Sequence, residues 1–281
     1  MDVTENGLIK TIGEIGLERL EECSTWAGQR FLPSVRTCFW SDVRGRAEAF
    51  GTCFLMRVQG KPFLVTAGHV IDKNEGGQRT IYVASGNRLS PLQATFYTTA
   101  GPDGQRGKDH YDFAFAELSD FQCKELAADS FIDETMVSAN QAAPERRAYM
   151  TLGFPASKQK VAWDKPIAYT EPWTFVGFHK HKPELATKLE VSGEHHFFVD
   201  RDERVRNFKG ERQNAVKPHG TSGGILIDLG PFDFAKLEPG SQCTALLAGL
   251  IIEHHKEHRA IVAVRIQLVI EQMLMAISSR A

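Results

Sequence analysis

Three residues whose side chains could serve as a nucleophile, a base and an orienting carboxylate stand at wide intervals along this chain of 281 residues. The first is Ser222, in the glycine-rich segment GTSGG at residues 220–224, directly before the apolar run at 225–227. Glycines adopt backbone conformations that bulkier residues resist, so such a turn can aim N–H groups at a developing oxyanion. Turns of this composition are also common in proteins without catalysis. A serine hydroxyl is a weak nucleophile, so Ser222 needs an adjacent base.

A base and a carboxylate occur upstream of this serine. His69 follows the apolar run and small-residue turn of FLVTAGHV (63–70), and Asp112 opens the apolar segment DFAFAEL (112–118). A partly dehydrated carboxylate needs a polar partner, and a histidine base needs a carboxylate to hold its tautomer. Each residue also has an ordinary structural explanation, as a histidine after a strand or an aspartate at a strand start. Asp103 and Asp109 are interpreted as loop acids.

The order and spacing of these three residues favour a shared site. His, Asp and Ser follow one another at intervals of 43 residues (69 to 112) and 110 residues (112 to 222). This is one of the chain orders in which the Ser-His-Asp triad occurs. The histidine and the aspartate then belong to the first half of the chain and the serine to the second, which predicts a site in the cleft between two halves.

The sequence around these three residues has the residue pattern of short β-strands. From about residue 31, short β-branched and aromatic runs alternate with Gly, Pro, Asn and Asp, and regular helical stretches do not separate them. This pattern predicts an all-β fold with two β-rich halves. The expected organisation is a helical extension at 1–28, a first barrel at 29–125, a linker at 126–145, a second barrel at 146–264 and a C-terminal helix at 265–281.

Helical spacing of apolar residues marks both ends of the chain. Isoleucines and leucines from Ile9 to Leu20 recur at roughly helical intervals, which predicts an amphipathic helix over residues 7–23. Apolar residues from Val269 to Ile277 predict a second helix over 265–279.

Composition argues against two classes of partner. With 33 Lys+Arg against 35 Asp+Glu, the net charge of −2 gives no excess for coating nucleic acid. The longest apolar run, residues 245–252, is far shorter than the roughly 20 residues of a membrane span. The N-terminus is acidic and has no uninterrupted apolar core, so no secretory signal is predicted.

Five cysteines, at wide spacing and without a CxxC motif, predict reduced thiols in a cytoplasmic protein rather than a disulfide framework. The histidine-rich segment EHHKEH (253–258) has a spacing that a zinc site would use, but it lies between two apolar runs and is better explained as a hairpin loop. We therefore expect no metal and no cofactor.

Five motifs together resemble those of chymotrypsin/trypsin-like serine peptidases, of the bacterial type without signal peptide or disulfides. FLVTAGHV resembles the histidine motif, with Gly68 where alanine is commoner, and DFAFAEL and GTSGGIL resemble the aspartate and serine motifs. AFGTCFLM (49–56) and MTLGFP (150–155) resemble two further strands of that family. The resemblance covers about residues 30–270. It implies a double six-stranded β-barrel and hydrolysis of peptide bonds through an acyl-enzyme.

By this resemblance, Ser222 is the nucleophile, His69 the general base and then acid, and Asp112 the residue that orients it. The backbone N–H groups of Gly220 and Ser222 form the oxyanion hole. Thr221 replaces an aspartate that, in many secreted members, pairs with a new N-terminus after zymogen cleavage. Activation therefore does not follow that route, and the oxyanion hole is either preformed or ordered by a partner.

The resemblance also places a specificity pocket beside the serine. Val216 at its base speaks against selection of Arg or Lys, Lys217 favours an acidic side chain unless it points to solvent, and Glu253 would favour a basic one. The stretch 201–212 mixes charges and is interpreted as an exposed loop near the site. The expected pocket residues are Val216, Lys217, His219, Ile252, Glu253 and His254.

Two functions remain as hypotheses. The first is a cytoplasmic serine endopeptidase acting on a protein or peptide substrate. The second, favoured by the two terminal helices, is a proteolytic effector or peptide-binding scaffold that stays latent until an activating protein partner binds, in a bacterial stress or defence context.

Overall fold

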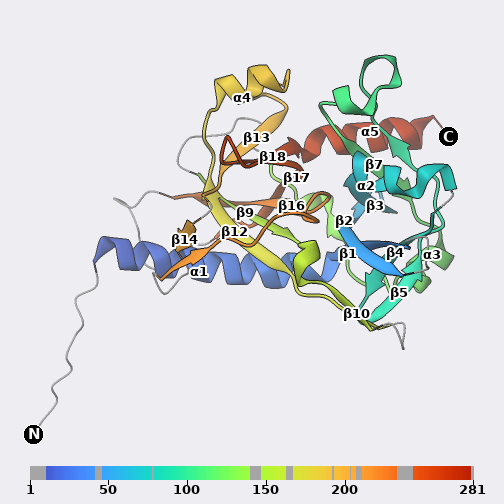
Figure 1. Ribbon diagram of the computed structural model, residues 1–281, viewed down its shortest axis with the longest axis horizontal. Helices are drawn as coiled ribbons and strands as arrows, with labels where there is room; N and C mark the ends of the chain where they lie inside the picture. The colour runs from blue at the N-terminus through green and yellow to red at the C-terminus, as the bar shows by residue number, and fades with distance from the viewer. Residues whose placement is uncertain are drawn as a thin grey trace, which may run out of the picture.

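Two β-sheets lie side by side, with a helix at each end of the chain (Figure 1). This computed structural model describes residues 11–41, 46–77, 79–139, 147–162, 167–191, 193–202, 204–206, 211–232 and 243–279. The fold is mostly β, as the punctuated apolar runs of the sequence predict.

The first sheet is built mainly from the N-terminal half. Its strands are β1 (Val35–Ser41), β2 (Ala47–Val58), β3 (Lys61–Ala67), β4 (Ile81–Ser85), β5 (Arg88–Pro91), β6 (Tyr97–Thr98), β7 (Phe113–Glu117), β8 (Ile132–Asp133), β10 (Lys160–Ala162) and β11 (Ile167–Tyr169). They follow the order β10-β11-β5-β4-β1-β2-β3-β7-β6, and β8 pairs with β2 in parallel. Short helices α2 (Gly68–Ile71) and α3 (Asp120–Glu125) connect them.

This sheet is larger than the expected six-stranded barrel, because it has ten strands. The hairpin β10–β11 comes from the second half of the chain and joins the edge strand β5, where Ile167 pairs with Arg88. Ala168 of the hairpin packs in a small apolar cluster with Phe39 and Ala84. A hairpin from the second half of the chain thus extends the sheet of the first half. The pattern of apolar residues within a strand cannot predict such a tertiary contact.

The second sheet is built from the C-terminal half and closes on itself. Six strands follow the order β12-β9-β16-β17-β18-β13, and a bridge between His179 and Val199 joins the two edge strands. The strands are β9 (Arg147–Gly153), β12 (Trp173–Phe178), β13 (His196–Asp200), β16 (Ile225–Pro231), β17 (Leu246–His255) and β18 (Ala260–Arg265). Helix α4 (Pro183–Lys188) and the separate hairpin of β14 (Arg204–Arg206) and β15 (Arg212–Asn214) lie outside this sheet.

One apolar core holds the two sheets together. It includes Phe54 from the first sheet, Leu152 and Ile225 from the second, and residues of both terminal helices. Burying one such large apolar side chain stabilises the fold by about 1.5–3 kcal/mol. The interface between the sheets is therefore part of the folding core, and the site that forms across it has rigid walls.

The N-terminal helix α1 (Ile12–Phe31) is offset from the predicted range of 7–23. It begins at a capping box, in which the Thr11 N–H donates to Glu14 Oε2 at 2.7 Å and the Glu14 N–H donates to Thr11 Oγ1 at 3.2 Å. Its buried residues run from Gly16 to Phe31, while Ile12 near its start is 63% exposed. The predicted residues 7–10 lie outside the described part of the chain.

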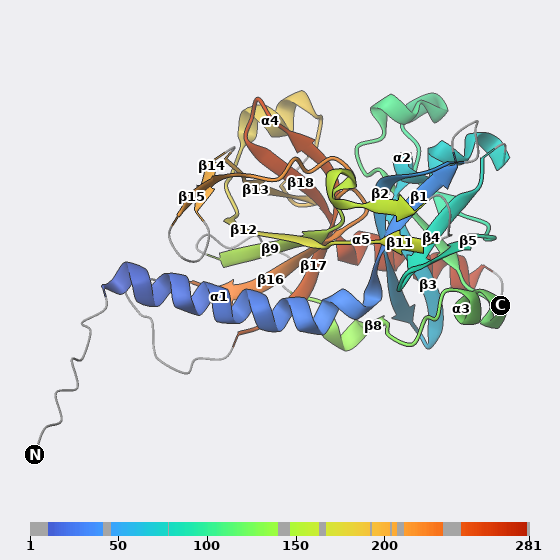
Figure 2. The same cartoon turned by 60° about the horizontal axis from the view of Figure 1, so that its bottom comes forward.

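Both terminal helices cover the sheets. Helix α1 runs along the second sheet and leads into β1 of the first (Figure 2). The C-terminal helix α5 (Ile266–Ser278) confirms the predicted helix to within one residue at each end, and contacts strands of both sheets. Among the helices in the described ranges, none has the length and apolarity needed to cross a bilayer.

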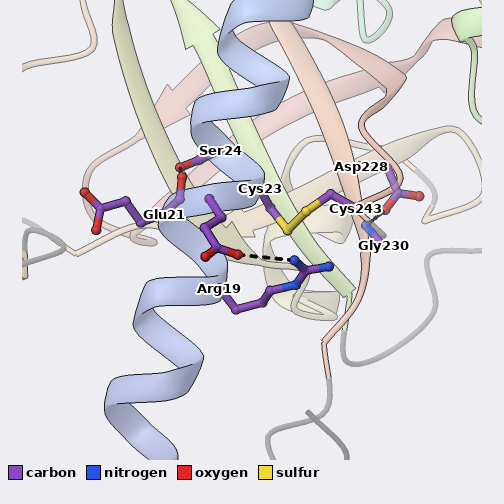
Figure 3. Close-up of a disulfide and its surroundings, with 8 residues drawn as sticks. Arg19, Glu21, Cys23, Ser24, Asp228, Gly230 and Cys243 are labelled. Atoms are coloured by element: carbon purple, nitrogen blue, oxygen red, sulfur yellow. Dashed lines mark hydrogen bonds and ion pairs between the residues drawn. A yellow bond between two sulfur atoms is a disulfide. The ribbon is translucent and has the colours of Figure 1, made fainter. Parts of the chain in front are cut away.

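The expectation of reduced thiols throughout is wrong for two of the cysteines. Cys23 on α1 and Cys243 before β17 form a disulfide with a Cα–Cα distance of 5.4 Å (Figure 3). They are 220 residues apart in the sequence. Their proximity arises only because α1 folds back onto the second sheet, so sequence spacing could not show it. Cys38, Cys53 and Cys123 are free.

Reduction of this disulfide should destabilise the protein. A crosslink restricts the unfolded chain, and its loss typically costs about 2–4 kcal/mol of the free energy of unfolding. We expect the Cys23→Ser variant to unfold at a lower denaturant concentration than the wild type and to be insensitive to reductant. The control Cys123→Ser, at a free cysteine, should keep the sensitivity of the wild type. Five alkylatable thiols in the unreduced wild type would contradict the assignment.

Candidate active site

His69 and Asp112 form a tightly bonded pair in the first half of the protein. His69 lies in α2, directly after β3, and Asp112 directly precedes the neighbouring strand β7. The ring Nδ1 of His69 donates to Asp112 Oδ2 at 2.5 Å, and the His69 backbone N–H donates to Asp112 Oδ1 at 2.9 Å. Because a carboxylate only accepts, the proton sits on Nδ1 and Nε2 is left as the basic nitrogen.

A buried network behind Asp112 holds it in place. Asp112 has a φ of 43°, in the left-handed region that side chains other than glycine rarely adopt. Its N–H donates to Asp109 Oδ1 at 3.1 Å, and Asp109 Oδ2 accepts from Thr99 Oγ1 and from Arg106 Nη1, both at 2.7 Å. Asp109, interpreted from the sequence as a loop acid, is therefore a buried positioning residue.

Arg106 extends this network to the helix that carries the histidine. Its guanidinium donates to both carboxylate oxygens of Asp72, at 2.7 and 3.0 Å. Asp72 directly follows α2. A Cβ on Gly68 would lie 2.8 Å from Arg106 Nη1 and 3.0 Å from Asp112 Oδ1. The close approach of these two groups explains why glycine stands where alanine is commoner in the resembling family.

The turn around Ser222 directs two N–H groups outward. The carbonyl of His219 accepts from the Ala156 N–H, and the carbonyl of Thr221 accepts from the Gly224 N–H, both at 2.8 Å. In a planar trans peptide the N–H points opposite to the carbonyl. The N–H groups of Gly220 and Ser222 therefore point away from these partners, and neither donates a hydrogen bond within the described structure. Paired N–H donors of this kind are what an oxyanion requires.

Thr221 stabilises this turn locally. It is buried, and its Oγ1 donates to the carbonyl of Pro218 at 2.7 Å, as its backbone N–H also does at 2.8 Å. The turn thus has hydrogen bonds of its own at residue 221, the position expected from the sequence to lack a zymogen-type aspartate.

Thr52 on β2 joins the serine turn to the first sheet. Its N–H donates to the carbonyl of Ser222 at 2.9 Å, and its Oγ1 donates to the carbonyl of Gly220 at 2.8 Å. The same Oγ1 accepts from the Phe154 N–H at 2.9 Å. A Cβ on Gly223, whose φ is +86°, would lie only 1.8 Å from the Thr52 carbonyl oxygen. Only glycine permits this approach, so the two halves meet beside Ser222.

The serine and the histidine are brought to the same stretch of β2. The residue before Thr52, Gly51, contacts α2, since a Cβ there would lie 2.8 Å from Val70 Cγ1. Within the described residues, Ser222 Oγ makes no hydrogen bond, including to His69. Catalytic hydrogen bonds are often long in unliganded enzymes and tighten when substrate binds.

The predicted pocket residues fall into two segments that a buried arginine connects. The carbonyl of Val216 accepts from Arg201 Nη2 at 2.5 Å, and His254 Nε2 accepts from Arg201 Nη1 at 2.8 Å. Lys217 and His219 are exposed, so the interpretation of Lys217 as pointing to solvent fits better. The stretch 201–212 is not exposed throughout as expected, because Arg201 is only 5% exposed.

A cavity of about 450 Å³ adjoins the site. Asp109 and His110 line it from the segment before Asp112, Leu189 and Glu190 from the segment after α4, and Ile252 and Glu253 from β17. Two of the predicted pocket residues, Ile252 and Glu253, thus face this cavity.

The histidine-rich segment 253–258 is a loop only in part, because Glu253, His254 and His255 belong to β17 and the turn before β18 begins at residue 256. His254 accepts from Arg201, and His255 Nε2 lies 2.6 Å from Glu253 Oε2. Across the described ranges, no cluster of three or more His, Cys, Asp and Glu side chains is arranged to hold a metal ion.

Comparison with known proteins identifies the fold. No protein-family model and no curated protein matches the sequence. Among solved structures, the scabies mite inactivated protease paralogue S-D1 is similar with a TM-score of 0.50 and 12% identity, over 88% of this chain and 93% of that chain. A structure concerning the Sesbania mosaic virus VPg protein has a TM-score of 0.45 and 11% identity, over 84% of this chain and 87% of that chain. The protein has the trypsin-like double β-barrel fold, with an added helix at each end.

The pKa of His69 offers a direct test of the pair. Burial lowers it, but the hydrogen bond to Asp112 and the nearby negative charges of Asp112, Glu253 and Asp72 outweigh burial and raise it above 6.5. We expect the ring to titrate above 6.5 by NMR. In an Asp112→Asn variant burial should prevail and move the pKa below 6.5. His254, whose pKa burial and the charge of Arg201 lower to about 4, is an internal reference. An unchanged His69 pKa in the variant would contradict the pairing.

Proposed function

We propose that this protein is a serine endopeptidase that hydrolyses peptide bonds through an acyl-enzyme. The observation that carries this proposal is the serine turn, in which the carbonyls of His219 and Thr221 are hydrogen-bonded while the N–H groups of Gly220 and Ser222 have no acceptor within the described residues. The bonded pair of His69 and Asp112 supports it, because it supplies a base with a fixed tautomer. Fold likeness alone does not carry it, since the mite paralogue is itself described as inactivated.

Each residue has a defined step in the proposed reaction. Ser222 Oγ attacks the carbonyl carbon of the scissile bond while His69 Nε2 takes its proton, and Asp112 stabilises the imidazolium. The N–H groups of Gly220 and Ser222 bind the oxyanion, and each such donor contributes about 3–4 kcal/mol to the transition state. His69 then protonates the leaving amine, and water hydrolyses the acyl-enzyme by the same route.

A polypeptide is the substrate that the surroundings favour. The cavity beside the site extends from Glu253 to the segment after α4, which gives room for residues on one side of a scissile bond. The chemistry uses only side chains and backbone groups, so the proposed reaction requires no cofactor.

A second candidate is an effector that a partner activates. Two observations favour it: Ser222 and His69 are not hydrogen-bonded, and α1 presents the exposed apolar residues Ile12, Ile15 and Trp26. Against it, Thr221 and Thr52 already hold the serine turn without a partner. A bacterial stress or defence role belongs to this candidate.

The compartment is also part of the proposal. The sequence favours the cytoplasm, whereas a structural disulfide is more typical of oxidising compartments. Alkylation of thiols in cells before lysis distinguishes the cytoplasm from an oxidising compartment, because Cys23 and Cys243 resist alkylation only where the disulfide forms.

Labelling with a fluorophosphonate tests the nucleophile. The purified protein should be labelled at Ser222 without any partner and should cleave a denatured protein substrate. The Ser222→Ala variant should lose nearly all turnover with its fold intact, while Ser279→Ala at the end of α5 should behave as the wild type. Labelling that occurs only after a cell extract is added would favour the partner-activated candidate. Equal turnover in Ser222→Ala would exclude the assignment.

The hydroxyl of Thr52 should be needed for activity. Thr52→Val removes the hydrogen bonds to Gly220 and Phe154 and loosens the oxyanion turn, so kcat should fall roughly tenfold or more, as for weakening of one oxyanion donor. Thr37→Val is a matched control, because Thr37 pairs with Thr52 across β1 and β2 and its buried Oγ1 has no hydrogen-bond partner. Equal kcat values for the two variants would show that Thr52 does not position the turn.

A further inference from the structure

The cavity beside the site combines an apolar floor with charged side chains. Its volume is about 450 Å³. Ile252 on β17 and Val262 on β18 line it and are 3% and 0% exposed. Leu189 and Val191, which follow α4, are partly buried and pack against the same core. A lining of this kind suits a side chain with a long aliphatic part, because such a chain covers apolar surface and keeps its polar end free to bind.

This cavity begins next to the place where β17 is bonded to the serine turn. The carbonyl of Ile251 accepts from the Gly223 N–H, and the Ile251 N–H donates to the Gly224 carbonyl, both at 2.8 Å. The next residue on the strand, Ile252, already lines the cavity. On the opposite side, His110 lines it from the segment that leads into the proposed catalytic aspartate. A polypeptide bound at the nucleophile therefore has the cavity within reach of a residue close to its scissile bond.

Glu253 provides a fixed negative charge in this cavity. Its Oε2 accepts from His255 Nε2 at 2.6 Å, which holds the carboxylate in place. Across the described part of the chain, Glu253 Oε1 makes no hydrogen bond or ion pair. The hydrogen bond from His255 lowers the pKa of Glu253 below its usual range, so the carboxylate is ionised at pH 7. One oxygen is thus positioned by the protein and the other is able to accept from a ligand.

The other charged groups that line the cavity are engaged or exposed. The carboxylate of Asp109 is buried and already accepts the hydrogen bonds described above. The side chain of Glu190 is 79% exposed, against 44% for Glu253. Lys108 and Lys188 are exposed, so water and salt screen their charges. Glu253 is therefore the charge that a group held on the apolar floor meets at close range.

Resting on the proposed function, we propose that this cavity binds a Lys or Arg side chain of the polypeptide substrate through the carboxylate of Glu253. The aliphatic part of that side chain covers Leu189 and Ile252, and its cationic end donates to Glu253 Oε1. Hydrogen bonds between charged groups are roughly twice as strong as neutral ones. An Asp or Glu side chain would meet a like charge there. The enzyme thus cleaves close to basic residues of its substrate.

Matched peptides that carry Lys, Gln or Glu in turn at each residue around one cleavage site test this selection. At one of these residues we expect kcat/KM for Lys to exceed that for Gln by about tenfold or more, with Glu the poorest. Glu253→Gln should remove the preference, and Glu253→Lys should invert it toward Glu. Each ratio is measured within one variant, so any effect of Glu253 on the pKa of His69 cancels.

Two matched variants show whether the effect belongs to Glu253. Glu125→Gln, whose carboxylate lies 3.2 Å from Arg88 on the first sheet, should leave the preference unchanged. Glu190→Gln should keep most of it, because that side chain is exposed. A wild type that cleaves without preferring Lys at any of these residues would overturn the selection and leave the peptidase function intact. A preference that survives Glu253→Gln would also overturn it.

Binding to the Ser222→Ala variant separates the two proposals. Alanine-rich peptides with a single central Lys, Gln or Glu are titrated against this variant by fluorescence anisotropy. A Kd for the Lys peptide about tenfold or more below that for Gln, with the difference lost when Glu253→Gln is added, supports the selection. If the wild type then shows no turnover, only the peptidase function fails. Equal Kd values, or no measurable binding of the Lys peptide, overturn the selection.

Discussion

The hydrogen bonds from His69 to Asp112 are the interaction on which the rest of the site depends. One carboxylate accepts both from the ring and from the backbone of the same residue, so ring orientation and main-chain position are set together. To do this, Asp112 adopts a left-handed backbone conformation that the buried carboxylate of Asp109 holds by hydrogen bonding. Strained backbone of this kind persists only where its surroundings enforce it, and it gathers at functional sites.

The second constraint is the contact between the two barrels at the turn around Ser222. Thr52 of the first barrel binds the carbonyls of Gly220 and Ser222 of the second. The position of the serine turn is therefore set by the strand that also supports the histidine helix. His196 of the second barrel adds a further tie, because its ring Nε2 donates to the carbonyl of His110 at 2.8 Å. The placement of the serine turn relative to His69 and Asp112 thus depends on the interface rather than on either barrel alone.

The sequence predicted the double-barrel fold and grouped His69 with Asp112, because both follow from local strand patterns and motif composition. Three features could not be predicted. From the sequence, Asp109 is interpreted as a loop acid, because its hydrogen bonds to Arg106 and to the Asp112 N–H are visible only in the structure. Arg201 lies in a mixed-charge stretch, yet it is only 5% exposed and donates hydrogen bonds to Val216 and His254. The Cys23–Cys243 disulfide requires α1 to fold back across the second sheet. Each depends on neighbours that are distant in the chain.

The most direct test of this account is a crystal structure of the protein after reaction with a peptidyl phosphonate. The account predicts a covalent bond from Ser222 Oγ to phosphorus, with one phosphonate oxygen about 2.7–3.1 Å from the N–H groups of Gly220 and Ser222 and His69 Nε2 within hydrogen-bonding distance of the adduct. An adduct on another residue, or one whose oxygen points to solvent while His69 stays apart from it, would contradict the account.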